Sequence, residues 1–181
     1  MKELLLGCTG SVSVLSVPFL VLDLMLEHQA DVQVVMTPGA QKFVTAFSFE
    51  VLTGKPVVTD VFSAQTRNHI NLVGACSVFL IAPATANTLS KVACGIADNI
   101  VTMCAAVCMG SDTKLVMAPS MNPSMWKNPA LQHNLGLLES RGVTIVPPRG
   151  GICIANKSEE GETAMAGSDV IIETLQRLAK S

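Results

Sequence analysis

The chain has 181 residues and a formal net charge of −2, with 14% charged and 49% hydrophobic residues. This length fits one domain with a sizeable core, and the absence of a basic cluster excludes nucleic acid as a partner. So little charge favours either a membrane protein or a subunit that buries surface in a homo-oligomer. Asp23 interrupts the longest apolar run, residues 12–26, and a membrane span needs roughly 18 to 20 continuous apolar residues. We therefore expect an oligomer and no membrane segment.

The N-terminus and the cysteines indicate the compartment. The first residues lack the longer apolar segment of a signal peptide. The six cysteines lie in apolar contexts without a C-x-x-C pair. We expect a cytoplasmic protein with buried, reduced thiols and no metal site.

Short apolar runs alternate with longer stretches of helical periodicity, which is typical of a parallel α/β sheet. The first helix is indicated by an apolar stripe that consists of Val12, Leu15, Phe19, Leu22 and Leu26. In chain order, the expected strands are residues 2–6, 31–36, 77–82, 114–118 and 143–146, with a short extended segment at 57–58. The later helices are expected before 54–56 and at 89–94, 98–107, 128–140 and 168–180.

These elements predict one α/β domain over residues 1–181, with a Rossmann-like, flavodoxin-like fold in which helices flank a parallel sheet. Ile171, Leu175 and Leu178 are expected to face inward from the last helix. Residues 149–167 are rich in glycine and polar residues and show no periodicity. We expect them to form a flap over a binding site.

Two loops of small and polar residues follow the first two expected strands. Gly7-Cys-Thr-Gly-Ser11 lets backbone N–H groups approach an anion at a helix N-terminus. Thr37 follows the second strand, and parallel strands place both loops at the edge of the sheet where ligands bind. Neither a G-x-G-x-x-G nor a G-K-[ST] motif occurs there, so the ligand predicted is a mononucleotide phosphate. Taken on its own, each loop is more often a turn with a helix cap than a binding loop.

The loop Ala82-Pro-Ala-Thr-Ala-Asn-Thr88 follows the most apolar strand. Thr85, Asn87 and Thr88 offer short side chains for hydrogen bonding. A helix cap formed by Asn87 or Thr88 would account for one of them, and three exceed what one cap needs. The loop is therefore a second candidate binding segment.

Two further segments carry a candidate base and a candidate amide. His69 follows Asn68, a good N-cap, so it is expected in the first turn of a helix. Histidine can act as a base near neutral pH, although a lone histidine is more often structural. In Pro119-Ser-Met-Asn-Pro-Ser-Met-Trp126, the Asn122 amide needs a partner because its surroundings are apolar. That partner could be a substrate carboxylate, or Asn122 could brace the loop.

In this order and spacing, the segments resemble the homo-oligomeric flavin-containing cysteine decarboxylases. That family includes phosphopantothenoylcysteine decarboxylases and enzymes that oxidatively decarboxylate the C-terminal cysteine of peptide antibiotics. The chain matches its H-I-x-L motif at His69, its P-A-S-A-N-T motif with Thr85 in place of the serine, and its P-x-M-N-x-x-M-W motif around Asn122. The resemblance implies FMN rather than FAD, and a trimer or a dodecamer built of trimers with the flavin between subunits.

The resemblance also implies roles for individual residues. His69 and Asn122 are expected to be catalytic. The residues expected to bind FMN are Gly10, Ser11, Val12, Thr37, Thr85, Ala86, Asn87, Thr88 and Ser120. The residues expected to contact the substrate are Asn122, Met125, Cys153 and Met165.

Residues 149–167 depart from part of the family. Phosphopantothenoylcysteine decarboxylases carry A-C-G-x-x-G-x-G-R-M here, whereas this chain keeps Cys153 but lacks those glycines and the arginine before Met165. Its Ile-Cys-Ile-Ala sequence is more similar to the peptide-cysteine enzymes. The sequence therefore predicts oxidative decarboxylation of a precursor peptide ending in cysteine, to an aminoenethiol. The alternatives are the phosphopantothenoylcysteine decarboxylase of coenzyme A biosynthesis and a non-catalytic flavoprotein.

Overall fold

The computed structural model describes residues 3–62, 68–152 and 160–179. Its main sheet has five parallel strands in the order β2-β1-β3-β4-β5, and a separate antiparallel pair is formed by β6 and β7. The strands of the sheet are β1 (Leu4–Cys8), β2 (Val32–Met36), β3 (Val78–Ala84), β4 (Lys114–Pro119) and β5 (Thr144–Ile145). The hairpin strands are β6 (Arg149–Ile152) and β7 (Glu160–Ala164).

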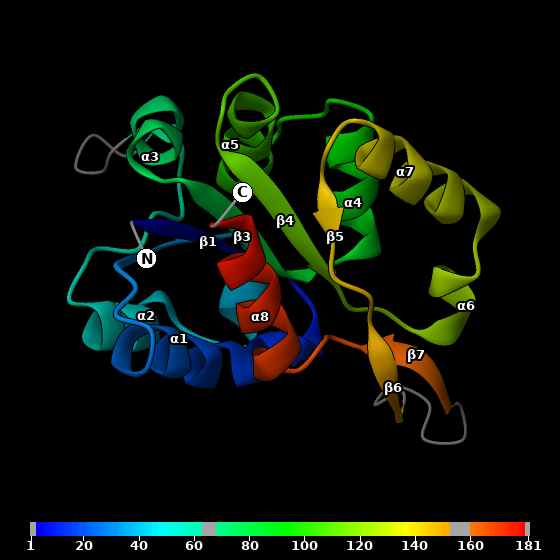
Figure 1. Cartoon of the computed structure of the whole chain (residues 1–181), viewed down its shortest axis with the longest axis horizontal. Helices are drawn as coiled ribbons and strands as arrows, with labels where there is room; N and C mark the ends of the chain where they lie inside the picture. The colour runs from blue at the N-terminus through cyan, green and yellow to red at the C-terminus, as the bar shows by residue number, and fades with distance from the viewer. Residues whose placement is uncertain (1–2, 63–67, 153–159, 180–181) are drawn as a thin grey trace.

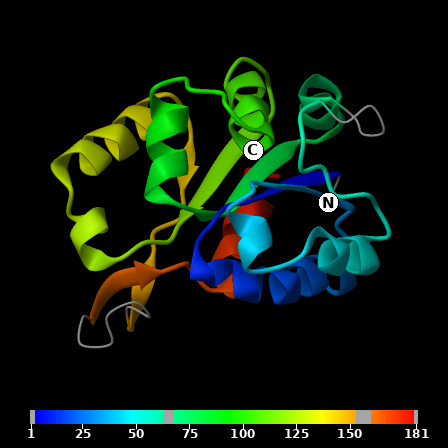
Figure 2. The same ribbon diagram turned by 180° about the vertical axis from the view of Figure 1, so that it is seen from behind.

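Helices cover both faces of the main sheet, as Figures 1 and 2 show from opposite sides. One face is covered by α1 (Val17–Leu26), α2 (Ala46–Thr53) and α8 (Ser168–Leu178). The other face is covered by α3 (His69–Ala75), α4 (Ala86–Ala93), α5 (Ile100–Cys108) and α7 (Pro129–Ser140). Three short helices follow the carboxyl ends of β1, β2 and β4, namely η1 (Val12–Ser16), η2 (Ala40–Lys42) and α6 (Pro123–Trp126).

β1, β2 and β3 have no polar side chain except that of Gln33, because both faces of the sheet are covered. Every residue of β1, β2 and β3 is buried. Successive side chains of a strand point to opposite faces, so Leu4 and Leu6 join the core cluster under α1 while Leu5 joins the one under α5. Burial on both faces is the usual state of parallel sheets.

The predicted fold class is confirmed, with differences at the element boundaries. β1 ends two residues later than expected, at Cys8, and β5 has only two residues. Helix α6 was not expected because its four residues are too few to show a period. Residues 149–167, which show no periodicity in the sequence, contain β6 and β7. Glycine and glutamate are depleted in strands, which explains why the pattern did not reveal this hairpin.

The apolar stripe that indicated the first helix is not its buried face. Leu15, Phe19 and Leu26 are 52%, 67% and 76% exposed. The residues that this segment buries are Val14, Val17, Leu20, Val21 and Leu24. The segment is apolar on all sides, so periodicity could locate a helix but not its orientation. In α8, by contrast, Ile171 and Leu175 are fully buried and Leu178 packs against the core, as predicted.

The cysteines are mostly buried thiols. Cys8, Cys76, Cys104 and Cys108 are free and buried, whereas Cys94 is exposed at the end of α4, contrary to expectation. Burial raises the pKa of the Cys104 thiol to about 12, because desolvation disfavours the thiolate. Cys153 lies outside the described residues. Within the described ranges, no group of three or more His, Cys, Asp or Glu side chains is placed to hold a metal ion.

None of the helices in the described part of the chain combines the length and the apolar character that crossing a membrane requires.

Candidate active site

A cavity of about 520 Å³ lies at the carboxyl edge of the main sheet, within the usual size range of small-ligand sites. The loops after β1, β2, β3 and β4 all contribute to it, because parallel strands end at the same edge. The described lining residues are Thr9, Gly10, Ser11, Thr37, Pro38, Gly39, Thr85, Ala86, Asn87, Thr88, Lys91, Asn99, Ser120, Met121 and Met125.

Thr9 joins the loop after β1 to the loop after β3. Its buried hydroxyl donates to the carbonyl oxygen of Pro83 at 2.6 Å and accepts from the backbone N–H of Thr85 at 3.1 Å. Both backbone groups lie where the β3 ladder ends, so they depend on this side chain for a partner. Thr9 therefore fixes the position of the Thr85 loop relative to β1.

The loops after β1 and β2 approach closely at two glycines. A Cβ atom on Gly10 would lie 3.1 Å from the backbone of Gly39, and a Cβ on Gly39 would lie 3.3 Å from Cα of Gly10. Any side chain at Gly10 would push the loops apart. Both glycines line the cavity. Because they have no side chains, a ligand can approach their backbone groups.

Three serine hydroxyls form a cluster beside these glycines. The Ser120 hydroxyl lies 2.9 Å from that of Ser11 and 2.7 Å from that of Ser13. Ser11 also caps η1, since its oxygen accepts from the backbone N–H of Ser13. Ser11 and Ser120 line the cavity. Hydroxyl groups can rotate to donate to an anion, so the cluster suits a phosphate group.

The loop after β3 provides the N-terminus of α4. The N-cap residue is Thr85 rather than Asn87 or Thr88, and its hydroxyl oxygen accepts from the backbone N–H of Thr88 at 3.3 Å. The Thr85 and Thr88 hydroxyls are 3.1 Å apart. Because the cap uses Thr85, the exposed Asn87 side chain stays available to a ligand in the cavity, whereas the buried Thr88 hydroxyl is paired with Thr85.

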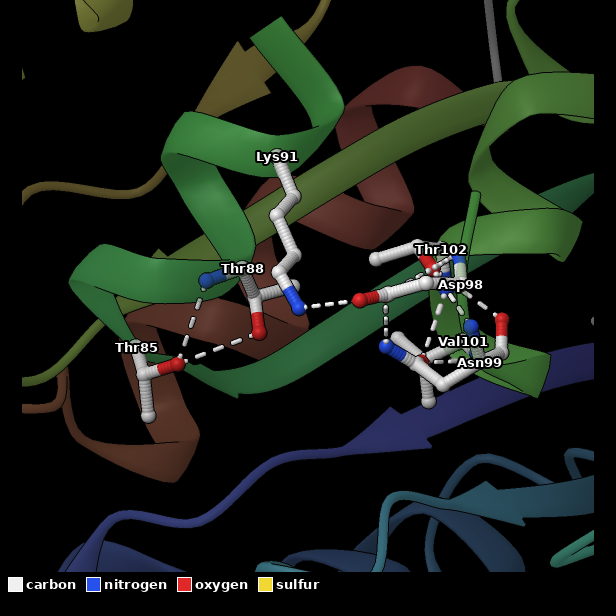
Figure 3. A network of polar contacts seen from close by, with 7 residues as sticks. All are labelled: Thr85, Thr88, Lys91, Asp98, Asn99, Val101 and Thr102. Carbon is white, nitrogen blue, oxygen red and sulfur yellow. Dashed lines mark hydrogen bonds and ion pairs between the residues drawn. The ribbon is translucent and has the colours of Figure 1, made fainter. Parts of the chain in front are cut away.

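An ion pair lies along the same cavity wall. The Lys91 ammonium contacts the Asp98 carboxylate at 2.5 Å, and Figure 3 shows Lys91 extending from α4 past Thr88 towards Asp98. The hydrogen bond from Lys91 and its positive charge hold the pKa of the Asp98 carboxyl below its usual range. Lys91 and Asn99 line the cavity, and both were missed in the sequence. Lys91 is three residues after Thr88, a spacing that places two side chains on one face of a helix.

Asn122 begins α6 next to the cavity. Its side-chain oxygen accepts from the backbone N–H of Met125 at 2.8 Å, which makes Asn122 the N-cap residue. The side chain is half-buried, and Met121 and Met125 on either side of it line the cavity. With its oxygen engaged, the amide N–H₂ group is the part of Asn122 that can bind a further acceptor.

His69 is the first residue of α3, and Asn68 caps that helix as the sequence predicts. His69 does not line the cavity of its own chain. Its Nδ1 atom is buried and has no hydrogen-bond partner among the described residues. Such atoms are rare in native structures because a buried, unpaired polar atom is costly.

The structure brings together most of the residues expected to bind the cofactor. The ones that line the cavity are Gly10, Ser11, Thr37, Thr85, Ala86, Asn87, Thr88 and Ser120. Val12 begins η1 and lies outside the lining. Of the residues expected to contact substrate, Met125 lines the cavity. Asn122 is not among the lining residues, although Met121 and Met125 beside it are. Met165 is 6% exposed within the core cluster under α1. Cys153 lies outside the described residues.

This fold and cavity define an α/β protein with a mononucleotide-sized site at the carboxyl edge of its sheet. The Flavoprotein family profile matches residues 1–180, and the chain belongs to that family. A probable phosphopantothenoylcysteine decarboxylase of Streptococcus mutans serotype c is 34% identical over 183 residues, covering 97% of each chain. Epidermin decarboxylase of Staphylococcus epidermidis is 32% identical over 146 residues, covering 81% of this chain and 77% of its own.

Among solved structures, SpaF, an FMN-dependent cysteine decarboxylase, superposes with a TM-score of 0.83 at 31% identity, covering 99% of this chain and 98% of its own. Membership of the Flavoprotein family and the likeness to these decarboxylases, among them the FMN-dependent SpaF, confirm the resemblance identified in the sequence and the predicted flavin cofactor. The peptidyl-cysteine decarboxylase EpiD also superposes, with a TM-score of 0.81 at 27% identity, covering 97% of this chain and 99% of its own, so both substrate types that the sequence left open occur among the similar proteins.

Replacing Thr9 with valine should destabilise the protein. Thr9→Val leaves the Pro83 carbonyl and the Thr85 N–H without their shared partner, so the free energy of unfolding should fall by about 1–3 kcal/mol. Urea unfolding followed by circular dichroism measures this. The matched control is Thr144→Val, since the Thr144 hydroxyl makes no hydrogen bond recorded among the described residues and its loss should cost less than about 0.5 kcal/mol. Equal effects of the two substitutions would refute the role of Thr9.

Proposed function

We propose that this protein is an FMN-dependent enzyme that oxidatively decarboxylates a peptide's C-terminal cysteine to an aminoenethiol. One observation carries the proposal. The segments that resemble the cofactor-binding motifs of the cysteine decarboxylases meet in a single cavity at the carboxyl edge of the sheet. Family membership and the relatives support the same class of enzyme.

The cavity suits FMN. Gly10, Ser11, Thr37 and Ser120 provide one cluster of small residues and hydroxyl groups for a phosphate, and the Thr85–Thr88 loop would lie along the flavin ring. When bound, FMN supplies the two-electron oxidation of the cysteine side chain to a thioaldehyde, from which CO₂ leaves to give the enethiol. The protein supplies binding and orientation.

Asn122 would hold the substrate carboxylate. Its oxygen already caps α6, so the N–H₂ group is the end that remains for an acceptor. Its neighbours Met121 and Met125 are apolar, and an amide–carboxylate hydrogen bond is stronger where water is excluded. Because the amide is a neutral donor, it can orient the carboxylate and the bond to it that breaks. It does not protonate the carboxylate.

His69 would remove the thiol proton of a substrate bound to another subunit. Its own chain's cavity does not include it, and its buried Nδ1 has no partner among the described residues. Ile70 beside it is 58% exposed, and Phe19 and Phe47 are 67% and 70% exposed. Covering such side chains in an oligomer would remove apolar surface from water. We therefore propose a homo-oligomer, a trimer or a dodecamer built of trimers, whose subunit contacts bring His69 to a neighbouring cavity.

The β6–β7 hairpin would act as the substrate flap. It projects beyond the main sheet, and β7 contacts α6, the helix that Asn122 begins (Figure 1). A flap at this position can close over the end of a peptide that reaches Asn122. The peptide substrate is favoured by the Ile-Cys-Ile-Ala sequence at residues 152–155 and by the absence of the glycine-rich motif of the phosphopantothenoylcysteine enzymes.

The second candidate is phosphopantothenoylcysteine decarboxylase. It is favoured by the relative of that description that is 34% identical over 97% of both chains. The first half of the reaction would be the same. Cys153 would then protonate the enethiol while the reduced flavin returns its electrons, giving a saturated amine and no net oxidation.

Mass spectrometry of the products distinguishes the two candidates. With a cysteine-ending peptide, the proposed enzyme should release a product that has lost CO₂ and two hydrogen atoms. With phosphopantothenoylcysteine, the alternative should release a product that has lost CO₂ alone. Cys153→Ser should leave the first reaction nearly unchanged, but it should stop the second at the oxidised intermediate. Turnover of phosphopantothenoylcysteine only, to the saturated amine, would contradict the peptide assignment.

Substitution of His69 and Asn122 tests their roles. His69→Asn should keep the flavin and lower the turnover number by about 10²–10⁴-fold, the usual effect of losing a positioned acid–base group. Asn122→Asp should also fail, because it turns a carboxylate towards the substrate carboxylate. His133→Asn, on the exposed side of α7, is the matched control. Wild-type turnover by His69→Asn would overturn its assignment.

Mixing the two inactive variants tests whether the site is shared between subunits. If His69 acts in a neighbour's cavity, oligomers reassembled from His69→Asn and Asn122→Asp subunits contain some sites with both residues intact. Activity should then return to a fraction of the wild-type value. Light scattering should show a multiple of the 19.0 kDa subunit mass. A flavin-bound monomer, or mixtures without any recovered activity, would count against a shared site.

A further inference from the structure

The Lys91–Asp98 ion pair has no part in the roles proposed above. Among the described lining residues of the cavity, Lys91 is the one charged side chain. The remaining polar lining consists of hydroxyl groups, amides and backbone. If a ligand in the cavity changes its charge, a single cation in this wall favours the more negative form of that ligand.

Asp98 is itself held in place. The Asn99 amide donates to its Oδ1 at 2.9 Å, and the Thr102 hydroxyl approaches the same atom at 3.4 Å. Thr102 also accepts from the backbone N–H of Asp98 at 3.1 Å, so the carboxylate is anchored to the first turn of α5 (Figure 3). The other carboxylate oxygen, Oδ2, contacts Lys91. The pair is thus a lysine from α4 positioned by an anion from the start of α5.

Lys91 and Asp98 differ in their electrostatic effect on a ligand in the cavity. The Lys91 ammonium adds positive charge to the cavity wall, and its side chain is 26% exposed. Asp98 fixes the ammonium and offsets part of its charge, but its side chain is 49% exposed and does not line the cavity. A ligand in the cavity should therefore experience the lysine more strongly than the aspartate, with moderate strength because water screens both groups.

We propose that Lys91 interacts electrostatically with the bound flavin and favours its reduced, anionic form over the neutral oxidised form. Asp98 is a positioning residue that limits this effect. The proposal rests on the FMN site of the proposed function and extends it, since a two-electron oxidation of substrate leaves the flavin with added negative charge. A cation in the wall of the cavity stabilises that charge without contacting the substrate.

The ratio of the dissociation constants of oxidised and reduced FMN measures the effect. It is obtained from the midpoint potential of the bound flavin relative to free FMN, and it requires no turnover. Lys91→Met should shift the ratio by about two- to fivefold against the reduced form, the range expected for a partly exposed charge. Asp98→Asn should shift it in the opposite direction, because the ammonium then lacks its counter-charge. Lys91→Arg should retain most of the wild-type value.

Two controls separate this effect from global charge and from local unfolding. Lys114→Met removes an exposed lysine from the start of β4, which is outside the cavity, and should leave the ratio unchanged. The double variant Lys91→Met/Asp98→Asn should give a ratio between those of the two single variants, because the two removed charges act on the flavin with opposite signs. Circular dichroism verifies that each variant is folded. If Lys91→Met does not fold, the Asp98→Asn and Lys91→Arg potentials decide the question.

Three results would overturn the proposal. The ratio could stay at the wild-type value in Lys91→Met and Asp98→Asn, or both changes could shift it in the same direction. Alternatively, Lys91→Met could weaken FMN binding but not riboflavin binding, with the ratio unchanged, which would make Lys91 a phosphate ligand. A protein with the expected potentials that decarboxylates neither cysteine substrate would refute the proposed function and leave this inference standing.

Discussion

The site depends on one geometric constraint, the ending of parallel strands at a common edge of the sheet. β3 pairs in parallel with both β1 and β4, so the loops that follow these strands are brought within hydrogen-bonding distance. The Thr9 hydroxyl uses this proximity to tie the first loop to the third, and Ser120 joins the fourth loop to the first. Gly10 and Gly39 allow the second loop to pack equally close. A cavity results because these short loops are fixed by each other and leave the space above the strand ends open.

The same fold leaves the proposed chemistry incomplete within one chain. Asn122 begins a helix at the rim of the cavity, whereas His69 begins a helix on the outer part of the molecule and keeps a buried nitrogen without a partner in the described structure. An enzyme that needs both groups can obtain the second from another subunit. The apolar side chains exposed on η1, α1 and α2 give a physical reason for such an association, because covering them removes apolar surface from water.

The proposed flavin site and the proposed substrate flap lie in different parts of the structure. The cavity is built on the main sheet, whose packing on both faces makes it rigid. The β6–β7 hairpin is a separate two-stranded unit that contacts α6. A family can therefore keep its flavin chemistry while changing the hairpin sequence. Relatives that act on peptides and on phosphopantothenoylcysteine are thus compatible with one fold.

The sequence by itself determined the α/β class, the order of the five sheet strands along the chain and most of the cavity residues. Strands buried on both faces appear as apolar runs, and small or polar residues at their ends mark the loops that meet a ligand. It also located Asn68 as the cap that begins α3. These features are local, so the residue pattern records them directly.

Only the tertiary structure decided which side of a segment is buried and which distant groups meet. Residues 12–26 are apolar all round, and the side that faces the core was settled by packing against β1 and β2, which exposes Phe19. The pairing of Lys91 with Asp98 depends on how α4 and α5 are placed, and the exclusion of His69 from its own cavity depends on the position of α3. Such contacts join different elements of the fold. The residue pattern within each element does not encode them, because they are determined by side-chain packing and hydrogen bonding across the fold.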